Sequence, residues 1–428
     1  MKKRLAIIMI GVILIAVSVS CGKKEEALTA SYYISLGEAS LVGVDYEHAL
    51  EQFLKVIKIE PGNPRGYTGA AVAYVGLGDT EKAIAVLRDG LIALPGDVGI
   101  LAMLDGLEDL VAEATPTPIA TDAPETPPVS TAAATQNPLV TATAGPTGQP
   151  TPTPTQTQDT PAPAYITIKG VRYSTDLTEL VLRYGGLTNA DIEPLKYMTK
   201  LNNLWLGYNE ISDLTPLGSL TNLRMLDIGN NKISDITALS SLTNLTDLHL
   251  DGNHISNITP LRPLAKLTNL VLADNLVSDI TPLSSLTNLT QLDLGWNEIS
   301  DLAPLRLLIN LVDLGLSNNL ISDTTPLRSL VMLARLDLDY NQISDIAPLM
   351  SLTILTRLNL GDNQISDITP LSSLKNLTRL YLDNNKISSA EPLKALTSLT
   401  ELTLLGNDRI TQKQMDDLKE ALPECDIY

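Results

Sequence analysis

The chain has little of several residue types on which common protein classes depend. Its 428 residues include two cysteines and three histidines, and 49 acidic side chains outnumber 30 basic ones, which gives a formal net charge of −19 at pH 7. Two cysteines cannot supply a disulfide framework. Binding to a phosphate backbone requires a basic face, which so acidic a chain does not favour. We therefore expect neither a disulfide-stapled domain nor a partner that is a nucleic acid.

Aromatic residues are also scarce. They make up 4% of the chain, with one phenylalanine and two tryptophans, although 44% of all residues are hydrophobic. Leucine and isoleucine must therefore do the packing that rings do in most globular cores. The length allows two or three domains, and this composition favours a regular repeat.

Patterns that carry catalysis or bind metals are missing as well. The histidines are His48, His249 and His254, and none of them has a companion motif. There is no phosphate loop and no nucleophile–base pair, and neither the His/Cys spacing of a zinc site nor the Asp spacing of a calcium loop occurs. The sequence therefore predicts a protein that is not an enzyme and that uses no cofactor or metal.

The first residues have the pattern of an export signal. Lys2, Lys3 and Arg4 precede an apolar stretch that is too short to span about 30 Å of hydrocarbon, and Cys21 follows it. This segment resembles a bacterial lipoprotein signal. The resemblance implies that residues 1–20 are removed and that Cys21 carries the lipid anchor of segment 21–29, on the bacterial cell membrane and facing away from the cytoplasm. The alternative is an ordinary secretory signal with an incidental cysteine.

Residues 30–114 repeat with a period of 34. The repeated pairs are Tyr33 and Tyr67, Ala49 and Ala83, and Pro61 and Pro95. This segment resembles tetratricopeptide repeats, which implies a small all-α domain closed by a helix from Val98. Such domains hold peptides. Here the first helices lack a cluster of Lys, Arg and Asn, so a spacer or oligomerisation module is the alternative.

Residues 115–164 are rich in Thr, Pro and Ala and contain no Lys or Arg. Such a segment cannot pack a core, and its prolines fix φ and remove amide donors. It is predicted to be a disordered linker that holds the next domain away from the surface.

Residues 165–428 carry an asparagine at every twenty-second position. These are Asn209, Asn231, Asn253, Asn275, Asn297, Asn319, Asn341, Asn363, Asn385 and Asn407. The surrounding pattern, LxxLxLxxNxIsDIxPL, resembles leucine-rich repeats, and its SDITPL half is similar to the internalin type of bacterial surface protein. The resemblance implies a solenoid with a parallel β-sheet and a convex side of 3-10 or irregular turns. Alternating leucines point inward, and the asparagine amides bond backbone groups in the turns.

Both ends of this segment depart from the repeat. Residues from about 165 to 182 read as an N-terminal cap, with a strand that covers the first coil. Residues from about 411 to 428 have helical spacing at Met415, Leu418 and Leu422 and then a short strand, which predicts a C-terminal cap. Cys425 is interpreted as a buried apolar thiol in this cap.

The outward positions of the concave sheet are not fixed by the repeat, so we expect them to bind the ligand. Exposed rings bury much area at a low entropic cost; alternatively, a ring at a strand end only shields its neighbours' backbone. The candidate contact residues are the rings Trp205, Tyr208, Trp296, Tyr340 and Tyr381, the polar residues Asp227, His249, Asp293 and Asp337, and the row Arg335, Arg357 and Arg379.

The arginine row has two interpretations. Adjacent coils lie about 4.8 Å apart, so the three guanidinium groups could form an anion site. Alternatively, cross-strand pairing with Asp313 and Glu401 explains the row. The segment 165–428 carries 31 acidic and 20 basic side chains, which favours a basic partner.

Together these features predict a non-enzymatic, surface-tethered recognition or adhesion protein that binds a protein partner on the concave face. The alternative ligand of the same face is a glycan or a cell-wall polymer.

Overall fold

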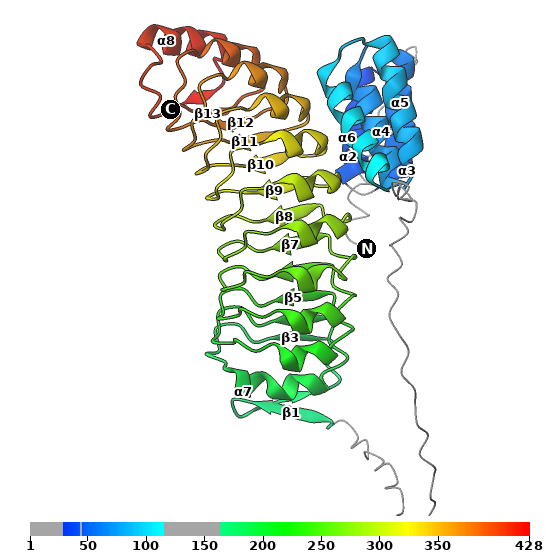
Figure 1. Ribbon diagram of the computed structural model, residues 1–428, viewed down its shortest axis with the longest axis vertical. Helices are drawn as coiled ribbons and strands as arrows, with labels where there is room; N and C mark the ends of the chain where they lie inside the picture. The colour runs from blue at the N-terminus through cyan, green and yellow to red at the C-terminus, as the bar shows by residue number, and fades with distance from the viewer. Residues whose placement is uncertain (1–28, 43–44, 115–162) are drawn as a thin grey trace, which may run out of the picture.

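A computed structural model of the protein describes residues 29–42, 45–114 and 163–428. The predicted signal, Cys21 and all but the last two residues of the predicted linker lie outside the described residues. Figure 1 shows a helical module beside a long curved solenoid. The predicted fold class, a leucine-rich-repeat solenoid with a small all-α module, is confirmed.

The helical module has five helices in the described ranges. Side chains of Asp45, Asn63 and Asp79 cap three of them by accepting backbone N–H groups. Phe53 and Leu87 are fully buried between the helices. The assignment of the module to tetratricopeptide repeats stays a prediction. The helices are α2 Ala30–Val42, α3 Tyr46–Ile59, α4 Pro64–Gly76, α5 Thr80–Ala93 and α6 Val98–Ala114.

The solenoid stacks short strands into one twelve-stranded parallel sheet. From β4 to β13 each central leucine is paired in register with its equivalent 22 residues on, as in Leu314 and Leu336. The strands are β3 Glu179–Val181, β4 Asn203–Trp205, β5 Met225–Asp227, β6 Asp247–His249, β7 Asn269–Val271, β8 Gln291–Asp293, β9 Asp313–Gly315, β10 Arg335–Asp337, β11 Arg357–Asn359, β12 Arg379–Tyr381, β13 Glu401–Thr403 and β14 Asp426–Ile427.

The opposite, convex side consists of 3-10 helices, as predicted. Aspartates cap these turns: Asp213 Oδ1 accepts the N–H of Thr215 at 2.9 Å, and the Thr215 hydroxyl and N–H together lower the pKa of Asp213. The 3-10 helices are η1 Glu193–Tyr197, η2 Thr215–Ser219, η3 Thr237–Ser241, η4 Thr259–Leu261, η5 Thr281–Ser285, η6 Ala303–Leu307, η7 Thr325–Ser329, η8 Ala347–Ser351, η9 Thr369–Ser373 and η10 Glu391–Ala395.

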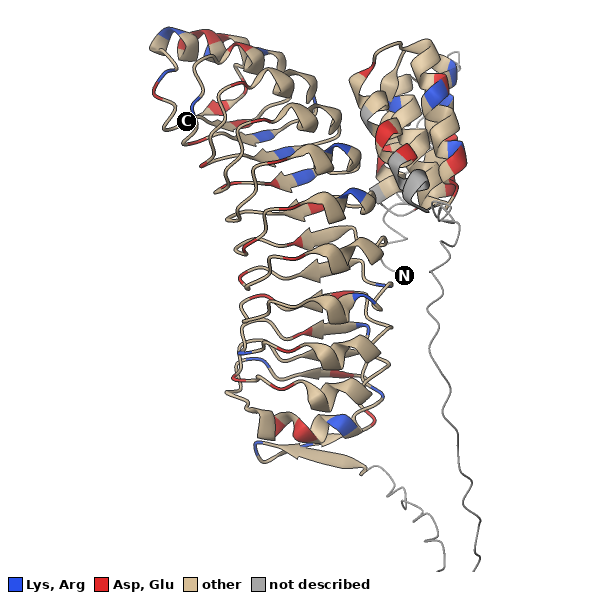
Figure 2. Ribbon diagram, in the orientation of Figure 1, with Lys and Arg blue, Asp and Glu red and all other residues tan. Residues whose placement is uncertain are grey.

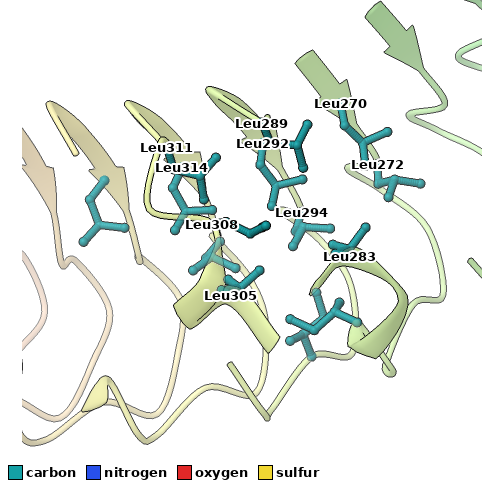
Figure 3. Close-up of a cluster of buried hydrophobic side chains, with 14 of the residues drawn as sticks. Leu270, Leu272, Leu283, Leu289, Leu292, Leu294, Leu305, Leu308, Leu311 and Leu314 are labelled. Atoms are coloured by element: carbon teal, nitrogen blue, oxygen red, sulfur yellow. The ribbon is translucent and has the colours of Figure 1, made fainter. Parts of the chain in front are cut away.

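The interior is filled by leucine and isoleucine. Figure 3 shows leucines from the strands and from the 3-10 turns pointing toward one another across each coil, and Leu294 and Leu305 are fully buried. The asparagine of each coil ties it to its neighbours. Asn297 Oδ1 accepts the N–H of Val277 at 2.9 Å, and its Nδ2 donates to the carbonyl of Leu272 at 3.0 Å. The predicted structural role of the asparagines therefore agrees with the hydrogen bonds.

The two ends of the solenoid differ from its repeats. The N-terminal cap is an antiparallel hairpin, β1 Tyr165–Ile168 and β2 Val171–Ser174, followed by the short helix α7 Asn189–Ile192. The C-terminal cap is α8 Gln412–Ala421 followed by β14. Cys425 is only partly buried, contrary to the prediction, because β14 is the last strand and the solenoid packs on it from one side. Burial raises the pKa of its thiol.

Candidate functional site

The outward residues of the strands meet at a hollow in the middle of the concave sheet. Its volume is about 480 Å³, and residues of β7 to β11 line it. Gly315 lies in register between Asp293 and Asp337. A Cβ added to Gly315 would lie 2.6 Å from Asp293 Oδ1, so any other residue there would displace this carboxylate. The hollow therefore depends on the absence of a side chain between two carboxylates.

The arginine row lies along the same sheet, with Arg335, Arg357 and Arg379 in register. Two of the three are paired: Arg335 is 2.8 Å from Asp313 and Arg379 is 3.4 Å from Glu401. The Arg357 guanidinium instead lies 5.4 Å from the centre of the Tyr381 ring. Cross-strand pairing thus accounts for the two outer arginines, while Arg357 lines the central hollow. Figure 2 shows basic residues on neighbouring strands in the C-terminal half of the sheet. Exposed pairs of this kind are weak and can be exchanged for a ligand's charges.

A second hollow adjoins the first and shares Arg357 with it. Its volume is about 400 Å³, and Tyr340 and Tyr381 line it together with three aspartates. One of them, Asp339, has a pKa raised to about 7 by burial and by the neighbouring Asp337 carboxylate. Its Oδ1 is buried and, within the described ranges, has no hydrogen-bond partner.

Asp339 was missed by the sequence analysis, although a signal was present. The equivalent positions of most other coils carry a small residue, as Gly295, Ser317 and Gly361 illustrate. Asp251 and Asp383 also carry a carboxylate in this row, and of the three aspartates Asp339 and Asp383 line the second hollow.

Some of the repeated asparagines follow an aromatic residue, and this residue occupies a strained backbone position. The φ angles of Tyr208, Trp296 and Tyr340 are 59°, 56° and 51°, in the left-handed region that Gly, Asn and Asp tolerate best. Asn230, Gly252 and Asp274 occupy this position in other coils. The rings remain exposed, at 50%, 61% and 56% of their accessible surface. The fold therefore disfavours rings here, and they do not fill its core.

A further ring extends this row at the N-terminal end. Tyr184 also has a positive φ, of 57°, and its ring stacks on that of Tyr208 with centroids 4.5 Å apart. The two residues are 24 positions apart. A search at the period of 22 therefore does not identify them as equivalent. Trp205 is the last residue of β4, three positions before Tyr208, and is half-buried.

Two candidates near the N-terminal end serve the fold. Asp227 is only 6% exposed, forms an ion pair with Arg183, and accepts the N–H of Gly229 at 3.1 Å. It does not present a free carboxylate, which corrects its assignment as an exposed contact. Arg183 lies two coils before Asp227, and Gly207 of the coil between them carries no side chain. His249 Nε2 lies 3.3 Å from Asn269 Nδ2 and is half-buried.

The predicted contact residues therefore divide into two groups. Trp205, Tyr208, Asp227 and His249 lie on β4 to β6 or just after them. The rest lie on or next to β8 to β12, where the hollows are: Asp293, Trp296, Arg335, Asp337, Tyr340, Arg357, Arg379 and Tyr381.

Within the described ranges, no three or more His, Cys, Asp or Glu side chains gather so that they could hold a metal ion. Nor do these ranges contain a helix with the length and apolar character needed to cross a membrane.

Comparisons with known proteins agree with the fold. The family described as Leucine Rich repeats (2 copies) matches residues 221–263, 265–307, 331–373, 355–395 and 375–420. No curated protein sequence matches the chain. The matched family is one of binding repeats, and no catalytic family is indicated.

Several solved structures are similar. A leucine-rich-repeat protein of Leptospira interrogans is 27% identical, with a TM-score of 0.53, over 55% of this chain and 62% of that one. An internalin of Listeria monocytogenes is 32% identical, with a TM-score of 0.46, over 60% of this chain and 89% of that one. The Arabidopsis receptor kinase HAESA, solved with a peptide hormone and a co-receptor, is 23% identical, with a TM-score of 0.47, over 54% and 42%. The repeat match and the fold together identify the C-terminal part of this chain as a leucine-rich-repeat domain similar to those of the internalins.

Proposed function

We propose that this protein recognises another protein on the concave sheet, with β8 to β12 as the centre of the contact. The observation that carries the proposal is the placement of Trp296 and Tyr340 at positive φ. A ring there costs roughly 1–2 kcal/mol of backbone strain, whereas asparagine or glycine in the same row costs less. Exposed rings of this kind are favourable anchors in protein interfaces.

The charges around the central hollow favour a partner with a basic side chain. Asp293 and Asp337 flank the gap above Gly315, and Asp313 lines the same hollow. Arg335 already faces Asp313 at 2.8 Å, so the remaining carboxylates are the groups left for a ligand cation. A lysine or arginine of the partner would fit above Gly315, between Asp293 on β8 and Asp337 on β10.

The proposal includes a place for the protein in the cell. A lipid on Cys21 would hold it on the bacterial membrane, facing away from the cytoplasm. Adhesion would follow from recognition by a tethered protein. Substitution Cys21→Ala should move the protein from the membrane fraction to the soluble fraction and abolish labelling by a radioactive fatty acid. Lipid anchoring would be contradicted if the Cys21→Ala variant stayed in the membrane fraction and the parent protein took up no label.

The binding proposal is tested by partner capture with the full chain and with Trp296→Asn/Tyr340→Asn. Both substitutions place a residue that the same row uses elsewhere, so the solenoid should stay folded. Asp274→Asn is the matched control, because it changes the same row without removing a ring. We expect capture of a protein partner to fall at least tenfold in the double variant and to remain in the control.

Two results would contradict the binding proposal. One is capture that is equal for all three proteins. The other is retention on immobilised polysaccharide, with no protein captured, which would assign the face to a glycan.

A further inference from the structure

One flank of the solenoid departs from its repeat in three consecutive coils. Just before each strand, most coils carry a polar pair such as Thr221-Asn222 or Thr243-Asn244. The asparagine amide donates to the preceding coil, as Asn244 Nδ2 does to the Thr221 carbonyl at 2.9 Å. The departures replace polar residues by apolar ones and form the patch Ile309, Val331, Met332 and Ile354.

The solenoid's own core does not require this patch. Its four side chains are absent from the continuous leucine and isoleucine core of the repeats. They instead join the core of the helical module: Val331 and Met332 are 6% and 7% exposed, cluster with Phe53 and Leu104, and have Ile309 and Ile354 packed around them. The patch is therefore buried by a different part of the chain.

Helix α6 of the module also has a close fit to the convex turns. It lies against η7 and η8 (Figure 1). A Cβ added to Gly106 would lie 2.8 Å from Ser329 Cβ. A glycine within a helix is less favourable than an alanine, and the close approach of Ser329 explains why a glycine occupies this position. Ser329 and Ser351 are buried, whereas the equivalent Ser241 and Ser285 of uncovered coils are exposed.

The polar groups at this contact are satisfied. The Ser329 hydroxyl donates to the Arg306 carbonyl at 3.0 Å, and the Ser351 hydroxyl to the Arg328 carbonyl at 2.9 Å. At the rim, Asp105 lies 4.0 Å from Arg328. Covering these turns therefore leaves no serine hydroxyl without a partner.

We propose that this flank is a docking surface for the chain's own helical module, so that the two domains act as one body. Docking turns α2 and α4 of the module toward the solenoid. Leu41, Arg65 and Val72 of these helices line a cavity of about 380 Å³, with Met332 and Ile354 on the other side. A peptide could reach this face of the module only by entering that cavity or by displacing the solenoid. The concave sheet stays open.

The connection within one chain is geometrically allowed. Residues 115–162 separate α6 from the N-terminal cap, and the covered coils lie six repeats beyond β4. Six coils span about 30 Å of sheet, whereas 48 residues can span on the order of 150 Å.

The test restores the repeat's own residues in the full chain: Ile309→Thr, Val331→Thr, Met332→Asn and Ile354→Asn. The other coils carry these residues, so the solenoid should keep its fold, which circular dichroism would verify. Small-angle X-ray scattering should give one compact shape for the parent protein. For the restored variant it should give a larger radius of gyration and maximum dimension, because the module is released on its linker.

A second variant tests the contact from the side of the module and covers the case in which the restored variant does not fold. Gly106→Ala should also enlarge the scattering dimensions, by less, whereas Gly99→Ala in the same helix should not, because a Cβ there meets no solenoid atom within 4 Å.

Two outcomes would overturn the proposal. The first is a parent protein that already scatters as two independent bodies. The second is a parent dimer, measured by light scattering, that dissociates when the patch is restored, since the patch would then join two copies.

Discussion

Two neighbouring rows of the solenoid obey opposite rules. The row of Asn297 has the same residue in ten coils, buried and bonded to the coil before it. The row of Trp296, one residue earlier, has an equally constant backbone, with φ between 51° and 73° from Tyr208 to Asn384 and Gly406. Its side chains nevertheless vary among Asn, Asp, Gly, Tyr and Trp. A fixed backbone therefore dictates the side chain only where that side chain closes backbone hydrogen bonds, and the side chains of the second row are free to vary.

The largest expected change in stability follows the loss of one of the repeated asparagines. Asn297→Ala removes the acceptor for the Val277 N–H and the donor to the Leu272 and Leu294 carbonyls. Buried groups left unpaired cost about 1–3 kcal/mol each, so we expect the free energy of unfolding to fall by about 3 kcal/mol in chemical denaturation.

The adjacent exposed residue provides the control. Glu298→Ala should change the stability by less than about 0.5 kcal/mol. If Asn297→Ala cost no more than this control, the asparagine row would not be the structural one.

A second prediction concerns a carboxylate that the fold does not need. The folded-state pKa of Asp339 is about 7, above its usual value, because of burial and the Asp337 carboxylate. Between about pH 4 and pH 7 the folded protein holds a proton that the unfolded chain has released, so the stabilising contribution of Asp339 is full below about pH 4 and is lost as the pH rises to about 7. After allowance for partial exposure, the loss should be on the order of 1 kcal/mol.

The substitution Asp339→Asn should flatten this slope, as followed by thermal unfolding between pH 4 and pH 7. The capping aspartates Asp213, Asp279 and Asp367 have lowered pKa values because threonine hydroxyl and N–H groups donate to them. Their contribution is therefore lost only as the pH falls below about 4, outside this window. An unchanged slope in Asp339→Asn would assign the effect to another group.

The repeat could be predicted from the sequence because each coil contacts its neighbours at a constant offset of 22 residues. The same reasoning failed where a side chain reaches across a coil. Asp227 was assigned outward by alternation, but Arg183, two coils earlier, pairs with it. The hollow at Gly315 and the perturbed Asp339 depend on what neighbouring side chains leave open, which periodicity does not encode. The contact between the helical module and the solenoid joins residues at no constant sequence separation, so periodicity could not predict it. The apolar patch around Met332 is the sequence feature that indicates it.

The last prediction is a gain in stability, whereas Asn297→Ala is a loss. It separates the row of Trp296 from the row of Asn297 most directly. Trp296→Asn replaces a ring at φ 56° by a residue that the same row uses at Asn230 and Asn318. We expect the free energy of unfolding to rise by about 1 kcal/mol, because the left-handed position is less strained, while ligand capture falls. The reverse change, Asn318→Trp, should lower stability by a similar amount. If Trp296→Asn were less stable than the parent protein, the indole would pack on its neighbours and serve the fold. The argument that the ring contacts a partner because the solenoid does not need it would then fail.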